Sequence, residues 1–478
     1  MKNATIWQFS ANIIALLLGM GQLAILARLL DVSAFGVIAI VWVVIYISQA
    51  ISDAGMSNYL IHKQTISKLT NSTIFWVSLC LGGIVAVVVG AVSPYIALWY
   101  QQPDLDFLIK LTSFHFIFTG LSSQLQARYL LDFKHVLLAK IEIASKIVGI
   151  SCSIICAVYY PEAWVIVVGL VVTTATKMIL LWICAQSDWY PRFSFSKQEA
   201  KKGIQYGSYQ MGGQILNQLR GNLDTLLLAS FLSPASLGIY SLAKSITIKP
   251  SQVLLPAVYK LMLPYIAKHQ NKPTDLIGEL SKVHYWIAAT LSLIYGVLIF
   301  LAEPFIDWFY GAGYEDMYAV FVPLSLFWFL RSVGGVFVGA ACQALGQTKR
   351  EFNWNVISFI LNVTVTSIAV QFGSVILAWS LVIMQILSLP IIHYYIFKPL
   401  FDMPRDSYFS PILVTMFSIS LIVIPMNYTW NFFIKSEFLF LNLSLVTLFA
   451  LPCHYLLLKK ITNKHSYFPA LSELRAKM

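Results

Sequence analysis

Charged residues are scarce in this sequence, at 11% of the chain, while hydrophobic residues make up 58%. A soluble domain carries roughly 25% charged residues, and the mean hydropathy here is +0.74. This composition excludes an ordinary soluble enzyme. It indicates instead an integral membrane protein.

Motifs for catalysis and for metal binding are also missing. No GxxxxGK[ST] loop occurs, which excludes ATP hydrolysis by that route. The six cysteines all fall in apolar runs, and Cys152 and Cys156 lie at helical spacing with no histidine or carboxylate beside them. We therefore expect free thiols packed as small apolar residues. We expect neither an enzymatic activity nor a cofactor.

Long apolar runs are abundant, and each is able to cross a hydrocarbon core of roughly 30 Å. The first run is a full span, so we expect it to be retained rather than cleaved as a signal peptide. The runs at 73–99 and 107–128 are plainly apolar. We predict fourteen membrane-spanning helices, at residues 5–29, 35–53, 73–99, 107–128, 139–159, 162–186, 204–232, 237–259, 284–309, 317–342, 354–371, 373–397, 409–428 and 437–458.

The net charge of +11 is distributed unevenly between the two sides of these spans. With the N-terminus inside, nearly all basic residues of the connecting segments fall on the cytoplasmic side, and the opposite side holds only Arg28, Lys110 and Lys435. The positive-inside rule then places both termini in the cytoplasm. The basic charge is a topology signal, and no nucleic-acid partner is expected.

A polar stripe marks the stretch from 203 to 250. Its members are spaced four, three, four and three residues apart, so they lie along one face of a helix, with Arg220 beside them. In lipid such a stripe must face protein or a water-filled cavity. The stripe comprises Gln210, Gln214, Asn217, Gly221 and Asp224.

A second polar stripe near the N-terminus matches the first, position by position, at a constant separation in the sequence. After the stripes, Leu232 and Gly238 correspond in the same way to Leu30 and Gly36. Matching polar positions, and a matching glycine after the turn, indicate two homologous halves. The N-terminal stripe comprises Gln8, Asn12, Ala15, Gly19 and Gln22.

Several charged residues lie within the spans. Lys249 and Arg331 are near the middle of theirs, and Lys244 is closer to an outer end. Together with Arg220 and Asp224 they predict a polar cavity between the halves, suited to an anionic, hydroxyl-rich cargo. The alternative is that Arg220 and Asp224 form a purely structural pair across one helical turn.

Other charges and prolines have simpler interpretations. Asp53 is expected to cap its helix or to pair with Lys63, with a coupling role as the alternative. Lys146 and Lys177 are expected to extend their ammonium groups to the membrane surface. Three prolines are expected to let the span at 237–259 and its extension bend: Pro250, Pro256 and Pro264.

Three segments resemble a known family. They are ARLLDVSAFGVIAIVWVVIYISQAISDAGMSNYLIHKQ, LQARYLLDFKHVLLAKIEIASKIVG and the turn SFLSPASLGIYSLA. With the fourteen-helix layout, they resemble the polysaccharide transporter branch of the multidrug/oligosaccharidyl-lipid/polysaccharide (MOP) flippase superfamily. Within it, the chain is similar to Wzx-like exporters of O-antigen and exopolysaccharide repeat units, the colanic acid type included.

The resemblance implies two six-helix lobes around a central cavity, alternating access, and movement of undecaprenyl-diphosphate-linked oligosaccharide from the cytoplasmic to the periplasmic leaflet of the bacterial inner membrane. Related lipid II flippases place cations on helices one, two and eight. Here Lys244 and Lys249 lie on helix eight, but helix two has no cation, which argues against a peptidoglycan precursor as cargo. A cation-coupled multidrug exporter of the same superfamily is the alternative function, and a scaffold for a polymerase or glycosyltransferase is another.

These expectations combine into one hypothesis for an all-α membrane protein. Its parts are an N-terminal lobe at 1–186, a linker at 187–203, a second lobe at 204–398, and two further helices with a basic tail at 399–478. Asp224 is the candidate ion-coupling residue. The candidate substrate-binding residues are Arg220, Lys249, Lys244, Arg331, Gln8, Asn12, Gln22, Gln210, Gln214 and Asn217.

Overall fold

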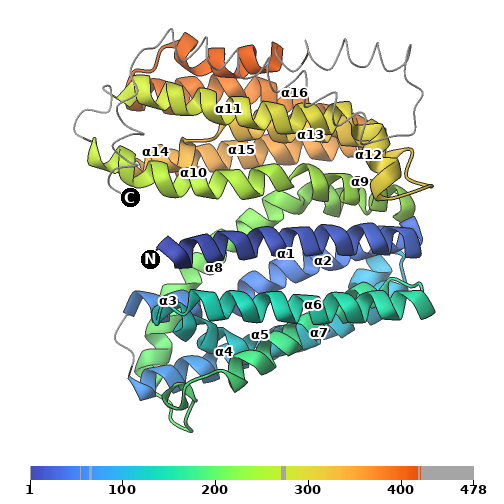
Figure 1. The fold of residues 1–478 in the computed structure, drawn as a ribbon, viewed down its shortest axis with the longest axis vertical. Coiled ribbons are helices and arrows are strands. Elements are labelled where there is room, and N and C mark those ends of the chain that lie inside the picture. The colour runs from blue at the N-terminus through green and yellow to red at the C-terminus, as the bar shows by residue number, and fades with distance from the viewer. Residues whose placement is uncertain (1, 54, 64–66, 271–275, 418–419, 421–478) are drawn as a thin grey trace. The chain divides into compact units, whose positions relative to one another are not determined.

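The computed structural model describes residues 2–53, 55–63, 67–270, 276–417 and 420. All regular secondary structure in these ranges is helical (Figure 1). The first twelve predicted spans are confirmed as helices. Residues 405–417 are helical as well, and the remainder of the predicted pair at 409–428 and 437–458 lies outside the described ranges.

The chain divides into two compact units, Met1–Ser241 and Leu242–Met478. The domain boundaries predicted from the sequence stay a prediction. The helices that begin in the first unit are α1 Lys2–Leu29, α2 Val32–Asp53, α3 Met56–Lys63, α4 Lys68–Tyr100, α5 Asp104–Leu131, α6 His135–Tyr159, α7 Trp164–Ile183, α8 Lys197–Leu228 and α9 Pro234–Thr247, with a short 3-10 turn at Ser187–Trp189.

Broken helices characterise the second unit. Predicted single spans appear there as pairs of helices, such as α9 followed by α10 and α13 followed by α14. The helices are α10 Lys249–Lys268, α11 Ile277–Phe300, α12 Ala302–Phe309, α13 Met317–Gly334, α14 Val338–Ala344, α15 Thr348–Ala369, α16 Ser374–Ile392 and α17 Lys398–Phe401, with a π-helical turn at His393–Phe397 before α17.

The break between α9 and α10 has an identifiable cause. Pro250 has no N–H to donate to the preceding turn, so it interrupts the backbone hydrogen bonds there. The hydroxyl of Tyr295 donates to the carbonyl of Thr247 at 2.9 Å and lies 2.7 Å from the Ser251 hydroxyl. These side chains satisfy polar groups at the break, which interrupts the helix at Ile248. Pro256 and Pro264 lie inside the continuous helix α10, and the bend expected from the three prolines stays a prediction.

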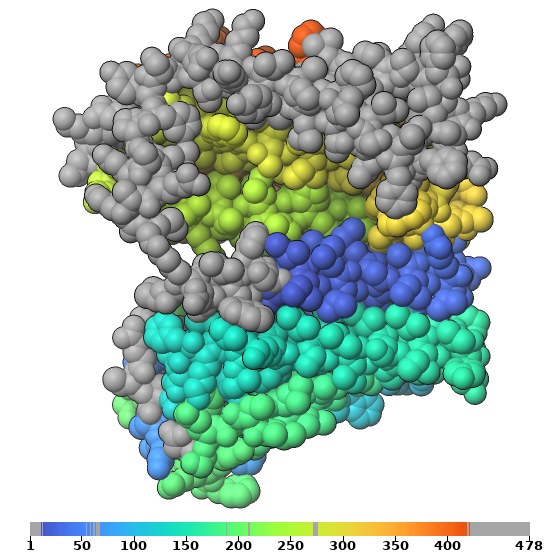
Figure 2. Space-filling view, in the orientation of Figure 1, coloured from blue at the N-terminus to red at the C-terminus, as the bar shows by residue number. Residues whose placement is uncertain are grey.

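In the first unit, α1 packs along α6, and α5 packs against α4 and α7. Figure 2 shows the side chains of α6 packed directly against the N-terminal helices. Eight of the described helical segments are long and apolar enough to cross a membrane. Helix α8 is not among them, because its polar stripe lowers the hydropathy.

Candidate functional site

A polar cavity of about 410 Å³ lies inside the first unit, among α2, α5, α7 and α8. Its wall is rich in hydroxyl and amide groups and carries Asp53, His115 and Lys177. A volume of this size holds several water molecules, since each occupies about 30 Å³ in the liquid. The lining residues are Gln49, Asp53, Gly55, Ser57, His115, Thr119, Ser122, Ser123, Gln126, Leu130, Thr173, Thr174, Lys177 and Gln214.

His115 of α5 links two other helices across this cavity. Its Nε2 lies 2.8 Å from Oε1 of Gln49 on α2, and its Nδ1 lies 2.8 Å from Oγ1 of Thr174 on α7. The Thr174 hydroxyl is also 2.8 Å from the Leu170 carbonyl, to which it donates. The imidazole therefore joins α2, α5 and α7 through side-chain hydrogen bonds.

Charged groups surround this link. Lys177 Nζ on α7 pairs with Glu142 Oε1 on α6 at 3.2 Å. Asp53 lies one helical turn after Gln49, so both side chains project from the same face of α2. One ammonium group and one carboxylate thus line the cavity with this histidine, and a second carboxylate, of Glu142, pairs with the ammonium group.

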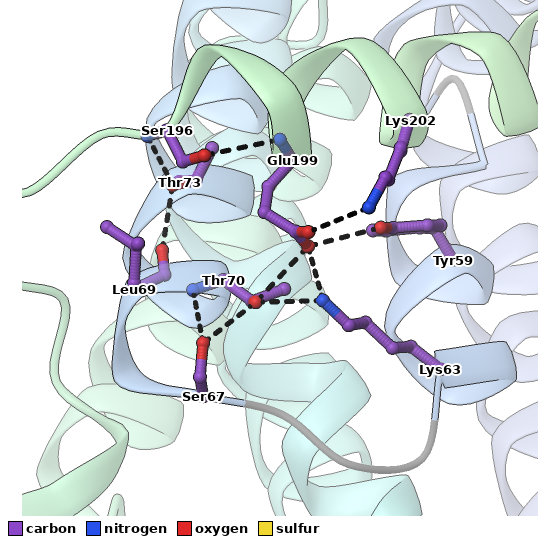
Figure 3. Close-up of polar contacts among 9 residues, drawn as sticks. All are labelled: Tyr59, Lys63, Ser67, Leu69, Thr70, Thr73, Ser196, Glu199 and Lys202. Atoms are coloured by element: carbon purple, nitrogen blue, oxygen red, sulfur yellow. Dashed lines mark hydrogen bonds and ion pairs between the residues drawn. The ribbon is translucent and has the colours of Figure 1, made fainter.

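A second polar cluster joins α3 to the start of α8, outside the apolar spans (Figure 3). Glu199 forms an ion pair with Lys63 and accepts hydrogen bonds from Thr70 at 3.2 Å and from Tyr59 at 3.3 Å. Lys202 lies 3.5 Å from its other carboxylate oxygen. These donors, Lys63 first, lower the pKa of the Glu199 carboxyl, while its partial burial acts in the opposite direction.

The chain matches a known protein family over more than half of its length. Residues 25–318 match the family described as polysaccharide biosynthesis protein. The amylovoran biosynthesis protein AmsL of Erwinia amylovora is 31% identical over 388 residues, which cover 80% of this chain and 98% of that protein. This chain belongs to the polysaccharide biosynthesis protein family.

Other relatives and folds agree with this assignment. The lipopolysaccharide biosynthesis protein WzxC of Escherichia coli (strain K12) is 25% identical to this polysaccharide biosynthesis protein, with 90% of the chain and 87% of WzxC covered. The lipid II flippase MurJ, in its inward closed conformation, superimposes with a TM-score of 0.76 at 14% identity, over 95% of this chain and 98% of MurJ. An inward-facing multidrug resistance MATE family transporter of the MOP superfamily gives 0.53 at 14% identity, over 87% and 95%. The resemblance inferred from the sequence is confirmed, and the two solved structures support the fold alone.

The predicted site residues of this polysaccharide biosynthesis protein are distributed over both units. Of the predicted set, Gln214 lines the described cavity. Arg220 and Gln22 are half-buried, and Asn217 is exposed. The side chains of Gln8, Asn12 and Gln210 lie outside the described part of the structure.

Asp224 is buried, and its Oδ2 accepts a hydrogen bond of 2.6 Å from the hydroxyl of Tyr240. Its Oδ1 accepts from the backbone N–H of Thr225 at 2.9 Å. Sequence reasoning did not identify Tyr240, which lies sixteen residues away on α9. The acid is therefore held by a partner that helical spacing alone does not show.

The predicted cations of the second unit occupy different settings. Lys249 begins α10, directly after the helix break, and Lys244 lies in the last turn of α9. The Arg331 guanidinium lies over the rings of Trp328 and Phe327, at 5.4 and 5.8 Å from their centroids. Aromatic faces stabilise a cation electrostatically, so Arg331 is held within its own helix α13.

Three expectations for the first unit were wrong. Lys146 does not extend to the membrane surface, because its ammonium group donates to the carbonyl of Ala15 on α1. Lys177 pairs with Glu142 instead of extending outward. The span at 107–128 is not plainly apolar, since His115 lies in it. Asp53, interpreted as a cap or a partner for Lys63, lines the cavity.

Proposed function

We propose that this polysaccharide biosynthesis protein is a flippase. It moves undecaprenyl-diphosphate-linked oligosaccharide repeat units of an O-antigen, capsule or exopolysaccharide from the cytoplasmic to the periplasmic leaflet by alternating access. It lies in the bacterial inner membrane with both termini in the cytoplasm, and it is a transporter rather than an enzyme. Its partners are the lipid-linked oligosaccharide, membrane lipids and, in the same assembly line, a polymerase and glycosyltransferases.

The observation that carries this proposal is the 31% identity to a protein of amylovoran biosynthesis, which extends over 98% of that relative. A chain with eight described helical segments long and apolar enough to cross a membrane fits the transport step of polysaccharide biosynthesis.

Charged groups within the spans suit such a cargo. We assign Arg220 and Lys249, with Lys244 and Arg331, to the diphosphate or to acidic sugars, because guanidinium and ammonium groups are the common phosphate ligands of proteins. Amide side chains hydrogen-bond sugar hydroxyls. The residues proposed for this role are Gln8, Asn12, Gln22, Gln210, Gln214 and Asn217, with Asp224 proposed for coupling to a cation.

The test uses variants of α8 and α10 in a strain deleted for the gene. Lys249→Ala, and Arg220→Ala on α8, are expected to insert normally and to reduce surface polymer at least about tenfold, because each removes a cation assigned to the diphosphate. Lys260→Ala is the matched control, because Lys260 lies on α10 and is exposed. Full polymer export by both site variants would reject the cationic site and favour a scaffold.

A further inference from the structure

We infer that the linker between α7 and α8, together with the start of α4, is a binding site for an anionic phospholipid. The lipid lies in the leaflet at that end of the helices, which is the cytoplasmic leaflet in the proposed orientation. Lipid binding at this site does not depend on the proposed flippase function. The site, which we call the linker patch, consists of two exposed cations and three exposed apolar side chains: Lys68, Arg192, Leu69, Phe193 and Phe195.

Two neighbouring hydroxyl groups of α4 hold the linker in place. Ser72 donates to the carbonyl of Lys68 at 2.9 Å and accepts from the backbone N–H of Arg192 at 2.8 Å. Thr73 repeats the pattern, since it donates to the carbonyl four residues before it at 2.7 Å and accepts from the backbone N–H of Ser196 at 3.0 Å (Figure 3). Both residues are buried. The backbones that carry the two cations of the linker patch are therefore joined through one hydroxyl group.

The fixed linker nevertheless exposes its phenylalanine side chains. Phe193 is 97% exposed, and its ring stacks on that of Trp76 of α4 with the centroids 5.4 Å apart. The indole N–H of Trp76 donates to the carbonyl of Arg192 at 3.0 Å. Phe195 is 56% exposed. Exposed apolar rings on a fixed segment, beside cations, are typical of a surface that lies in a membrane interface.

Aromatic side chains on two spans indicate where the hydrocarbon core ends. On α4, Trp76 and Tyr95 are nineteen residues apart, which is about 28 Å along a helix. On α7, Trp164 and Trp182 are eighteen residues apart, or about 27 Å. These separations match a core of roughly 30 Å, at whose boundaries Trp and Tyr are enriched. The linker stacks on Trp76, and its Tyr190 contacts Trp182 with ring centroids 5.7 Å apart, so it lies at one boundary.

The composition of the linker patch matches both parts of an anionic phospholipid. Lys68 and Arg192 are exposed, and neither forms an ion pair with a described residue. Basic residues at the membrane surface are attracted to anionic headgroups, while the rings of Phe193 and Phe195 suit the start of the acyl chains. An acidic segment of a partner protein would match the cations alone. The position of the rings at the hydrocarbon boundary therefore favours a lipid.

The first experiment identifies what the linker patch touches. Full-length protein with Phe193→benzoylphenylalanine is placed in vesicles of equal parts phosphatidylglycerol and phosphatidylcholine, each with its own isotope label in the acyl chains. After illumination, adducts with phosphatidylglycerol are expected to exceed those with phosphatidylcholine about fivefold or more, because one basic residue near an anionic surface contributes about this factor. The excess is expected to shrink in 1 M salt, which screens charges beyond about 3 Å.

The position of the probe has a control on the same helix that holds the linker. Val87→benzoylphenylalanine lies about midway between the two aromatic levels of α4, at a side chain that is 72% exposed. It is expected to form adducts with both lipids equally. Equal adducts at Phe193 would overturn the inference, and so would the absence of lipid adducts there. In intact cells, an adduct of Phe193→benzoylphenylalanine with a protein instead of a phospholipid would also overturn it and indicate an acidic partner.

The second experiment tests the two cations. Lys68→Gln combined with Arg192→Gln is expected to make the Phe193 probe react equally with both lipids. The matched control removes two exposed cations of α10 instead, by Lys260→Gln and Lys268→Gln. It changes the net charge equally and is expected to keep the preference. Both lipids compete in the same vesicles, so the ratio does not depend on the amount of folded protein. A preference that persists without Lys68 and Arg192 would overturn the inference.

The third experiment tests the hydroxyl group that joins the two cations. Ser72→Ala keeps both charges but removes the acceptor for the backbone N–H of Arg192. It is expected to reduce the preference for phosphatidylglycerol by at least about half, because the cations are no longer held together. Ser145→Ala is the control, since this buried hydroxyl donates at 2.8 Å to a carbonyl of its own helix, α6. An unchanged preference in Ser72→Ala would contradict the role assigned to this hydroxyl in the site.

Discussion

Gly36 lies directly against the main-chain carbonyl of Pro234: a Cβ atom at Gly36 would be 1.8 Å from that oxygen. The contact is reciprocal, because a Cβ at Gly238 would be 2.4 Å from the carbonyl oxygen of Val32. Val32 and Gly36 occupy the same relative positions in the first repeat as Pro234 and Gly238 in the second. The repeat read from the sequence thus appears in the structure as two helix starts, α2 and α9, that interlock through matching glycines.

Gly36→Ala is predicted to lower the free energy of unfolding by about 1–3 kcal/mol, the usual cost of forcing extra atoms into a packed contact. Gly83→Ala is the control, because a Cβ there meets nothing within 4 Å. Unfolding temperature in detergent, read by intrinsic fluorescence, should fall for Gly36→Ala and stay near the wild-type value for Gly83→Ala. Equal temperatures for the two variants would show that the close approach has no energetic consequence.

Lys177→Met is predicted to destabilise the first unit more than the double substitution Lys177→Met with Glu142→Gln. The single change leaves Glu142 without its ammonium partner, and removal of one member of a buried pair costs about 3–5 kcal/mol. The side chains of Lys177 and Glu142 are 24% and 35% exposed, so solvent screens their attraction. We therefore expect the single substitution to lower the free energy of unfolding by about 1–2 kcal/mol. Lys110→Met, whose pair with Asp106 is more exposed at 53% and 34%, should change stability by less than about 1 kcal/mol. A double variant as unstable as the sum of its parts would argue against the pairing.

Glu199→Gln is predicted to loosen the start of α8 and to increase cleavage of the segment 187–203 by added protease. The pKa of Glu199 is lowered in the folded chain, chiefly by the hydrogen bond from Lys63. Its contribution is therefore present above the ordinary glutamate value of 4.5 and is lost as the pH falls through the lower folded value. At neutral pH we expect about 1 kcal/mol from this cluster, reduced by solvent screening.

The cleavage assay has a matched control on the same helix. Lys197→Gln removes an exposed charge of α8 and should leave the cleavage rate unchanged. In the wild type, cleavage should be constant from neutral pH down to about 5 and should rise only in stronger acid. Cleavage that rises instead between pH 8 and 6 would point to a histidine elsewhere.

Tyr240→Phe is predicted to destabilise the protein by about 1–3 kcal/mol, because it removes one of the donors to the buried carboxylate of Asp224. Combination with Asp224→Asn should cost less than the sum of the two single changes, since both remove one interaction. Chemical unfolding of the four proteins gives this coupling energy. Tyr95→Phe, at an exposed tyrosine, should be neutral, and strictly additive energies would contradict the hydrogen bond.

Hydropathy was sufficient to predict the first twelve spans, because burial of apolar side chains in lipid dictates them. It did not predict α3, which is short and amphipathic, or the breaks inside single apolar runs. At α9 and α10 the break depends on Pro250 together with Tyr295, a residue from a different helix that satisfies the freed backbone. Such a partner is not visible in a one-dimensional pattern.

The residues that line the cavity of the first unit could not be grouped from the sequence either. Gln49, His115 and the neighbouring pair Thr174 and Lys177 are separated from one another by long apolar segments, and each resembles an isolated polar feature of a membrane helix. Only the packing of α2, α5 and α7 brings them together. Helical spacing identified the stripe of α8, where the polar residues share one helix, and this stripe contributes Gln214 to the cavity.

The most direct test of the central claim is the membrane sidedness of lipid-linked oligosaccharide in cells depleted of this protein, measured with a reagent that reaches only the periplasmic leaflet. Sensitivity to toxic cations and dyes is scored in the same cells. The flippase function predicts that the oligosaccharide accumulates on the cytoplasmic side, that surface polymer is lost, and that the intact gene restores both. Normal polymer with raised drug sensitivity would contradict it and indicate a multidrug exporter.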